Sequence, residues 1–154
     1  MADFMKSEVF LAFSTYASVM LVKMLIMGPL TGYFRMSRGA FSNPEDARAH
    51  GGTDEESKKK LMTTNPDVER VRRCHQNDLE NIIPFIGISL LYTLTEPNLS
   101  TALMHFRIFA ASRILHSIAY LVPLPQPSRG LCWLVGLGTT FSMVYRVLKA
   151  GMRL

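Results

Sequence analysis

The stretch VERVRRCHQNDLENIIPF, residues 68–85, decides how the fold of this chain is interpreted. Charged and amide side chains dominate positions 69–81, which contain no Gly, Pro or turn signal, and an apolar segment follows at 82–94. A charged group near the centre of a bilayer costs about 3 kcal/mol on insertion scales, so such groups usually face a bundle interior or a wet cavity. The stretch therefore predicts a membrane helix whose polar residues have a function.

The composition favours one membrane domain. The chain has 154 residues, the size of a single domain, and 48% of them are hydrophobic while 19% are charged. The charged share is below the value of about 25% that is usual for soluble proteins. The net charge of +5 is not carried by a soluble module with interleaved aromatic residues. We therefore interpret the basic excess as membrane topology plus an anionic ligand, and we expect no nucleic-acid partner.

The cysteines and the N-terminus exclude further classes. Cys74 and Cys132 are too few for a disulfide framework, and their spacing matches no metal motif, so no metal is expected. The opening residues MADFMKSEVF do not resemble a cleavable signal peptide. We expect the first span to act as its own anchor.

Four apolar stretches predict an all-α fold, a transmembrane four-helix bundle in a single membrane domain over 1–154. The expected spans are approximately 8–35, 66–96, 99–122 and 128–148, and a cytosolic loop covers about 38–64. A span needs roughly 20 mostly apolar residues, so each stretch must include polar flanks. A soluble helical domain is the alternative, but short connections between such apolar helices leave too little polar surface to cover it.

Local signals place the helix ends. Ser7 before Glu8 can start the first helix, and Asn65-Pro66-Asp67 supplies a cap, a first-turn proline and an acid ahead of the second. The segments 96–98 and 122–128, both with proline, separate the later helices. These capping and proline signals therefore agree with four long helices.

The basic residues predict the orientation. Nine of the seventeen Lys and Arg residues lie in 35–73, and the turn 96–98 has none. The positive-inside rule then places the long loop in the cytosol and that turn on the far side. Arg146, Lys149 and Arg153 argue mildly against this orientation, and the larger cluster decides.

Polar residues of the second helix form two stripes. Arg73, Asn77 and Glu80 lie at i, i+4 and i+7, and Arg72 and His75 form a second stripe. A packing lock between Arg73 and Glu80 is one explanation. It leaves Arg72, His75 and Asn77 unexplained.

The third helix repeats the pattern. Arg113, His116 and Tyr120 share one face, and Arg129 opens the fourth helix. Together with the second helix they suit a small ligand with several carboxylates and one ammonium, because arginines bind carboxylates bidentately and Glu80 can accept the ammonium. We interpret His105 and His116 as structural groups whose hydrogen bonds are satisfied inside the bundle. Cys74 and Cys132 are interpreted as packing residues.

Three segments carry a resemblance to a known family. These are ERVRRCHQNDLENIIPF at 69–85, FSNPED at 41–46 and LHSIAYLVPLPQPSR at 115–129. With the four-span layout they resemble the membrane-associated proteins in eicosanoid and glutathione metabolism, and within them the first-type branch of the microsomal glutathione S-transferases, over nearly the full length. The resemblance implies a homotrimer in the endoplasmic reticulum or the outer mitochondrial membrane. It also implies that glutathione is a co-substrate bound between subunits near the cytosolic face, and that lipophilic electrophiles and lipid hydroperoxides arrive through membrane lipid.

The resemblance also suggests site residues. The family's glutathione contacts fall on six positions that have the expected residue type: Arg35, Arg72, Arg73, His75, Glu80 and Tyr120. We add Asn77 from the polar stripe. Arg113 and Arg129 occupy family arginine positions and are the catalytic candidates, with Arg129 facing the sulfur. Ala47 stands directly after NPED, where mammalian members carry a cysteine, and this puts activation by thiol reagents in doubt.

The implied activity is glutathione transfer to lipophilic electrophiles, with glutathione-dependent peroxidase activity on lipid hydroperoxides. Two alternatives stay open: an eicosanoid synthase of the same family, and a non-catalytic lipid-binding membrane protein. An ion or proton pathway is disfavoured because the spans contain few acids.

Overall fold

The computed structural model describes residues 5–152, and all regular secondary structure in this part is α-helical. Two short helices in the long connection, α3 (Pro44–Ala49) and α4 (Glu55–Leu61), separate the first long helix from the second. The four long helices are α2 (Glu8–Arg38), α5 (Pro66–Thr93), α6 (Leu99–Leu121) and α7 (Ser128–Gly151). The prediction of an all-α chain is confirmed.

The helices begin where capping side chains are available. The Ser7 hydroxyl accepts a hydrogen bond from the Phe10 N–H at 3.2 Å. The Asn65 side chain accepts from the N–H groups of Asp67 and Val68 at 2.9 and 3.4 Å, and Pro66 occupies the first turn. These groups satisfy N–H donors that have no partner inside the helix. Both starts agree with the predicted caps.

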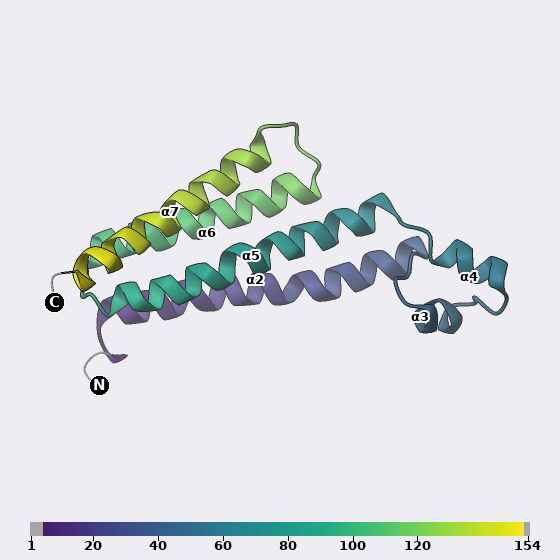
Figure 1. Cartoon of the computed structure of the whole chain (residues 1–154), viewed down its shortest axis with the longest axis horizontal. Coiled ribbons are helices and arrows are strands. Elements are labelled where there is room, and N and C mark those ends of the chain that lie inside the picture. Colours follow the sequence, from purple (N-terminus) through teal and green to yellow (C-terminus); the bar gives the residue numbers. More distant parts are fainter. Residues whose placement is uncertain (1–4, 153–154) are drawn as a thin grey trace.

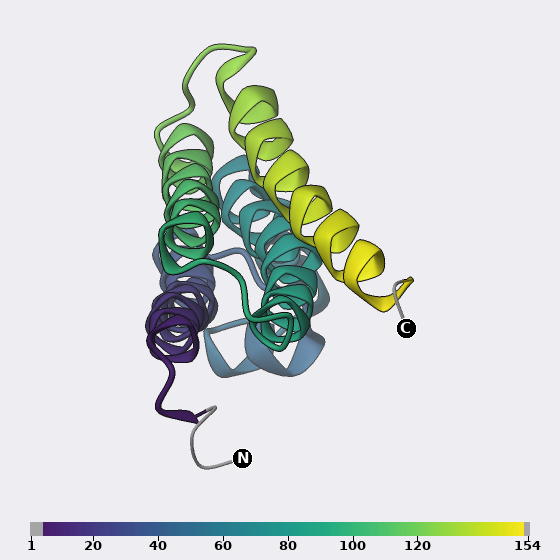
Figure 2. The ribbon, with the colours of Figure 1, turned by 90° about the vertical axis from the view of Figure 1, so that its left-hand side faces the viewer.

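The long helices pack in two pairs (Figure 1). Helix α2 lies along α5 and α6 lies along α7, while α5 also contacts α6 and α7. The two pairs are close at the end where α7 finishes and diverge toward the end that carries α3, α4 and the 122–127 loop (Figure 1). The view along the bundle shows α7 inclined across α5 (Figure 2). The start of α5 and the α6–α7 connection therefore both lie at the wider end of the molecule (Figure 1).

The core lies in the narrow half of the molecule. Phe85 of α5 stacks on Phe109 of α6 with ring centroids 3.7 Å apart, and Phe106 meets Phe85 edge-on. Met20 of α2 and Met143 of α7 are fully buried in the same cluster. Aromatic and thioether side chains from all four long helices therefore fix the closed end.

The outer surface is apolar. Leu25 of α2 is 70% exposed and Phe141 of α7 is 62% exposed, and many other large hydrophobic side chains point outward. Among the described helices, α2 and α7 are long and apolar enough to cross a membrane by length and composition. Such an exterior suits lipid and argues against the soluble alternative.

Candidate functional site

A basic cleft of about 570 Å³ lies at the wider end of the molecule. Its lining comes from the start of α5 and from the α6–α7 connection: Thr64, Asn65, Pro66, Glu69, Arg70, Arg73, Tyr120 and Arg129. Three arginines and one carboxylate, that of Glu69, line it. The cleft can therefore hold a small ligand that carries more negative than positive charge.

Arg129 is held against an aromatic face. Its guanidinium carbon lies 4.8 Å from the centroid of the Tyr120 ring, a cation–π arrangement. With the Gln126 amide oriented so that its oxygen faces Arg129, that oxygen accepts hydrogen bonds from Nη2 at 2.6 Å and from Nε at 3.3 Å. A second hollow of about 300 Å³, lined in part by Trp133, also borders Arg129. Arg129 thus stands between two open volumes with a defined orientation.

Arg73 lines the cleft and is exposed. Glu80 is also exposed and accepts a hydrogen bond from the Gln76 amide at 3.2 Å. No ion pair joins Arg73 to Glu80 in residues 5–152, so the packing-lock explanation is wrong for these side chains. Arg73 is available to a ligand.

The other predicted glutathione contacts do not line this cleft. Arg72 is exposed and makes a two-pronged ion pair with Glu69, at 3.0 Å from Nε and 2.8 Å from Nη2. His75 is half-buried on α5. Arg35 is half-buried on α2, and its Nε is buried without a partner among the described residues. A single chain therefore brings together Arg73, Tyr120 and Arg129, but not the whole predicted set.

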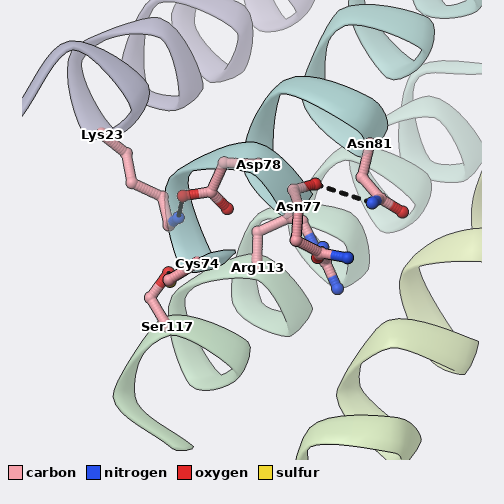
Figure 3. Close-up of polar contacts among 7 residues, drawn as sticks. All are labelled: Lys23, Cys74, Asn77, Asp78, Asn81, Arg113 and Ser117. Carbon is pink, nitrogen blue, oxygen red and sulfur yellow. Dashed lines mark hydrogen bonds and ion pairs between the residues drawn. The ribbon is translucent and has the colours of Figure 1, made fainter. Parts of the chain in front are cut away.

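Arg113 lies inside the bundle rather than in the cleft. It is fully buried, and its Nη1 donates to the Asn77 side-chain oxygen at 3.0 Å (Figure 3). Its Nε and Nη2 have no partner among the described residues. A Cβ placed on Gly136 of α7 would lie 3.4 Å from the Arg113 Nε, so the glycine lets α7 approach this guanidinium. Arg113 and Asn77 together link α5, α6 and α7.

Sequence reasoning missed a buried ion pair. Lys23 of α2 contacts Asp78 of α5 at 2.6 Å, with side chains 15% and 0% exposed (Figure 3). The sequence shows Lys23 only as an interruption of an apolar stretch. The available signal was a lone cation in the first predicted span and an acid in the second.

The histidine and cysteine predictions had mixed outcomes. His105 contacts the Thr101 carbonyl at 2.7 Å and the Ser142 hydroxyl at 3.0 Å, which confirms a satisfied structural group. The same interpretation is wrong for the Nδ1 of His116, which is buried without a partner in the described part of the chain. Cys74 is buried and donates to the Ser117 hydroxyl at 3.5 Å, as expected for a packing residue. Cys132 is a free, half-buried thiol.

Comparisons with known proteins connect this geometry to a family. The MAPEG family pattern matches residues 13–149. The chain is 53% identical over 154 residues to Microsomal glutathione S-transferase 1 of Sus scrofa, covering 100% of this chain and 98% of that protein. It is 54% identical over 150 residues to the Homo sapiens protein of the same name, with 97% and 96% covered. Prostaglandin E synthase of Homo sapiens is 35% identical over 149 residues, with 97% and 94% covered.

Proposed function

The chain belongs to the MAPEG family, and from this premise we propose that it is a membrane-bound transferase that conjugates glutathione to lipophilic electrophiles. Glutathione is the co-substrate, and lipid hydroperoxides are a second substrate class. The proposed location is the endoplasmic reticulum membrane and the outer mitochondrial membrane, with the site facing the cytosol.

One observation carries the proposal: Arg73 of α5 and Arg129 of α7 line the same cleft together with Arg70. Glutathione has two carboxylates, one ammonium and a thiol. Guanidinium groups bind carboxylates through paired hydrogen bonds, and a cleft with three arginines and one acid matches that charge pattern. The pocket therefore fits the charged ends of the tripeptide.

Arg129 is our candidate for the residue that faces the sulfur. A free thiol has a pKa of about 8.5, so about 3% is thiolate at pH 7 and full ionisation raises the reactive fraction about 30-fold. Lowering that pKa by about two units requires about 2.7 kcal/mol of preferential stabilisation of the thiolate. The Arg129 guanidinium, held against the Tyr120 ring, is the group in the cleft that we expect to supply this stabilisation.

The thiolate then attacks an electrophilic carbon and expels the leaving group. On a hydroperoxide it attacks the terminal oxygen and breaks the O–O bond, and a second glutathione reduces the resulting sulfenic acid to give a disulfide. Lowering the pKa of the glutathione thiol increases the thiolate fraction but makes each thiolate less nucleophilic, and these two effects partly offset each other. Most of the acceleration therefore comes from placing the two reactants together. A site open to lipid does so by concentrating apolar substrates beside the bound nucleophile.

We assign the remaining predicted contacts to the assembly. Arg35, Arg72, His75 and Glu80 do not line the cleft of their own chain. In a homotrimer they would contact glutathione held at the boundary with a neighbouring copy, while Asn77 and Arg113 support the site from inside. Native mass spectrometry of the detergent-solubilised protein should give three chains per particle, and a monomer with full activity would contradict this arrangement.

The activity is tested by three assays on the purified protein in detergent. We expect conjugation of a chloronitrobenzene, glutathione-dependent reduction of cumene hydroperoxide, and no efficient isomerisation of prostaglandin H. Efficient turnover of prostaglandin H alone would favour the eicosanoid synthase. Absence of glutathione binding in calorimetry would favour the non-catalytic lipid-binding protein.

A further inference from the structure

Three ionisable side chains, Lys23, Asp78 and Arg113, lie inside the bundle away from the cleft. Lys23 Nζ contacts Asp78 Oδ2 at 2.6 Å, and Arg113 donates to Asn77, the residue next to Asp78. Figure 3 shows Lys23 reaching Asp78 from α2, while Arg113 rises toward Asn77 from α6. Asp78 and Arg113 are both fully buried. The cluster contains two cations and one anion.

The buried cluster around Asp78 contains more positive charge than its direct partner Lys23 supplies. Its Oδ1 is buried and has no hydrogen-bond partner in residues 5–152, and neither do two of the nitrogens of Arg113. Asp78 is the only acid among the buried side chains of residues 5–152, and it adjoins Asn77, which accepts the hydrogen bond from Arg113. A buried charge that loses its counter-charge is strongly destabilising, because little solvent is present to replace the lost interaction.

We infer that Asp78 is the shared counter-charge of Lys23 and Arg113 and that, through Arg113, it positions the residues of the cleft. This inference deepens the proposed function and rests on it for its catalytic consequence. Asp78 does not line the cleft, so it is a positioning residue and not a catalytic one.

The spacing of residues along α5, α6 and α7 connects the buried cluster to the cleft. Asn77 lies one turn beyond Arg73 on α5, and Arg113 lies two turns before Tyr120 on α6. On α7, Gly136 lies against the Arg113 guanidinium and is two turns beyond Arg129. A guanidinium held at this junction fixes the relative placement of the three helices that carry Arg73, Tyr120 and Arg129.

A shared counter-charge predicts unequal effects for the two members of the ion pair. Lys23→Met leaves Asp78 and Arg113 as the buried charges of the cluster, so one cation still balances one anion. Asp78→Asn leaves two buried cations with no anion. The swap Lys23→Asp/Asp78→Lys restores the direct pair but places a lysine beside Arg113.

The experiment compares these three variants with Asp67→Asn, which removes the same kind of charge from an exposed α5 residue that pairs with Arg38. Thermal unfolding in detergent, glutathione affinity and turnover are measured. We expect Lys23→Met and Asp67→Asn to stay within about three-fold of the parent in turnover. We expect Asp78→Asn to lose at least ten-fold in turnover and at least three-fold in glutathione affinity, because the residues of the cleft are displaced together, and we expect the swap to give no recovery.

Equal losses in Lys23→Met and Asp78→Asn with recovery in the swap would overturn the inference, as would an unaffected Asp78→Asn. If Asp78→Asn does not fold, two double variants decide. Asp78→Asn/Arg113→Gln and Asp78→Asn/Lys23→Met should each recover folded protein in part, because each removes one of the two unbalanced cations. Recovery in the Lys23→Met double variant only would show that Asp78 serves Lys23 alone. The folding readout does not depend on transferase activity, so failure of the proposed function is separately visible.

Discussion

Arg129 and Arg73 line one cleft from different helices, and we expect different kinetic roles for them. Arg129→Leu removes the group that we propose stabilises the thiolate, and because full ionisation raises the reactive fraction only about 30-fold, turnover should fall by about 10- to 30-fold. Glutathione affinity should change little. Arg73→Leu and Glu80→Leu should chiefly weaken binding, by about ten-fold or more, because charge-assisted hydrogen bonds contribute about 1.5–3 kcal/mol.

Steady-state kinetics and calorimetry on the same preparations separate the two effects. Arg107→Leu is the matched control, since this exposed arginine of α6 contacts the Tyr16 hydroxyl at 3.2 Å and does not line the cleft. Unchanged turnover in Arg129→Leu would remove the role assigned to that residue.

Gly136 is the point where α7 approaches the buried polar cluster. A Cβ at this position would lie 2.9 Å from the Ser112 hydroxyl oxygen and 3.4 Å from the Arg113 Nε. Gly136→Leu should therefore overpack the α6–α7 interface and destabilise the fold by about 1–3 kcal/mol. Gly138→Leu is the control, because no neighbour lies within 4 Å of its Cβ position. Equal melting temperatures for the two variants, measured in one detergent, would show that the close approach does not matter.

At the scale of single elements, α4 shows how a capping acid responds to pH. The Ser57 N–H and hydroxyl donate to the Asp54 carboxylate at 2.9 and 2.7 Å, and these bonds hold the pKa of Asp54 below its ordinary value of 3.8. A lowered pKa means that the stabilisation is present above the ordinary value and is lost as pH falls through the lower, folded value. The start of α4 should therefore loosen only below about pH 4.

Amide hydrogen exchange at Ser57, corrected for the intrinsic rate, measures this effect. Protection should fall between pH 4 and pH 2. In Asp54→Asn the side-chain oxygen still accepts hydrogen bonds but does not titrate, so protection there should stay constant over the same range. An identical pH response in both proteins would assign the change to other acids of the loop.

The beginnings of the elements were predictable because their signals are local. Ser7 and the Asn65-Pro66-Asp67 run supply caps whose geometry depends on neighbours within three residues. Helical periodicity likewise gave the shared faces of Arg73 with Asn77 and of Arg113 with Tyr120. The partners across helices were not predictable, because contacts such as Lys23–Asp78 depend on packing between segments 55 positions apart.

At the scale of the whole molecule, the two helix pairs diverge toward the end where α5 begins (Figure 1). The cleft is lined there by residues from the start of α5 and from the α6–α7 connection. Sequence patterns predicted an all-helical chain and an arginine-rich site. They did not predict which arginines would be exposed, because burial depends on the angle between the pairs. Arg113 is fully buried while Arg73 faces the cleft, although both belong to similar polar stripes.

The most direct test of the account is the ultraviolet absorbance of the protein in detergent when glutathione is added at pH 7. A thiolate held by Arg129 should produce a difference band near the absorption of ionised sulfur, larger than the roughly 3% ionisation of a free thiol allows. The band should disappear in Arg129→Leu at saturating glutathione and persist in Arg107→Leu. Binding of glutathione without any thiolate band in the parent protein would contradict the central claim.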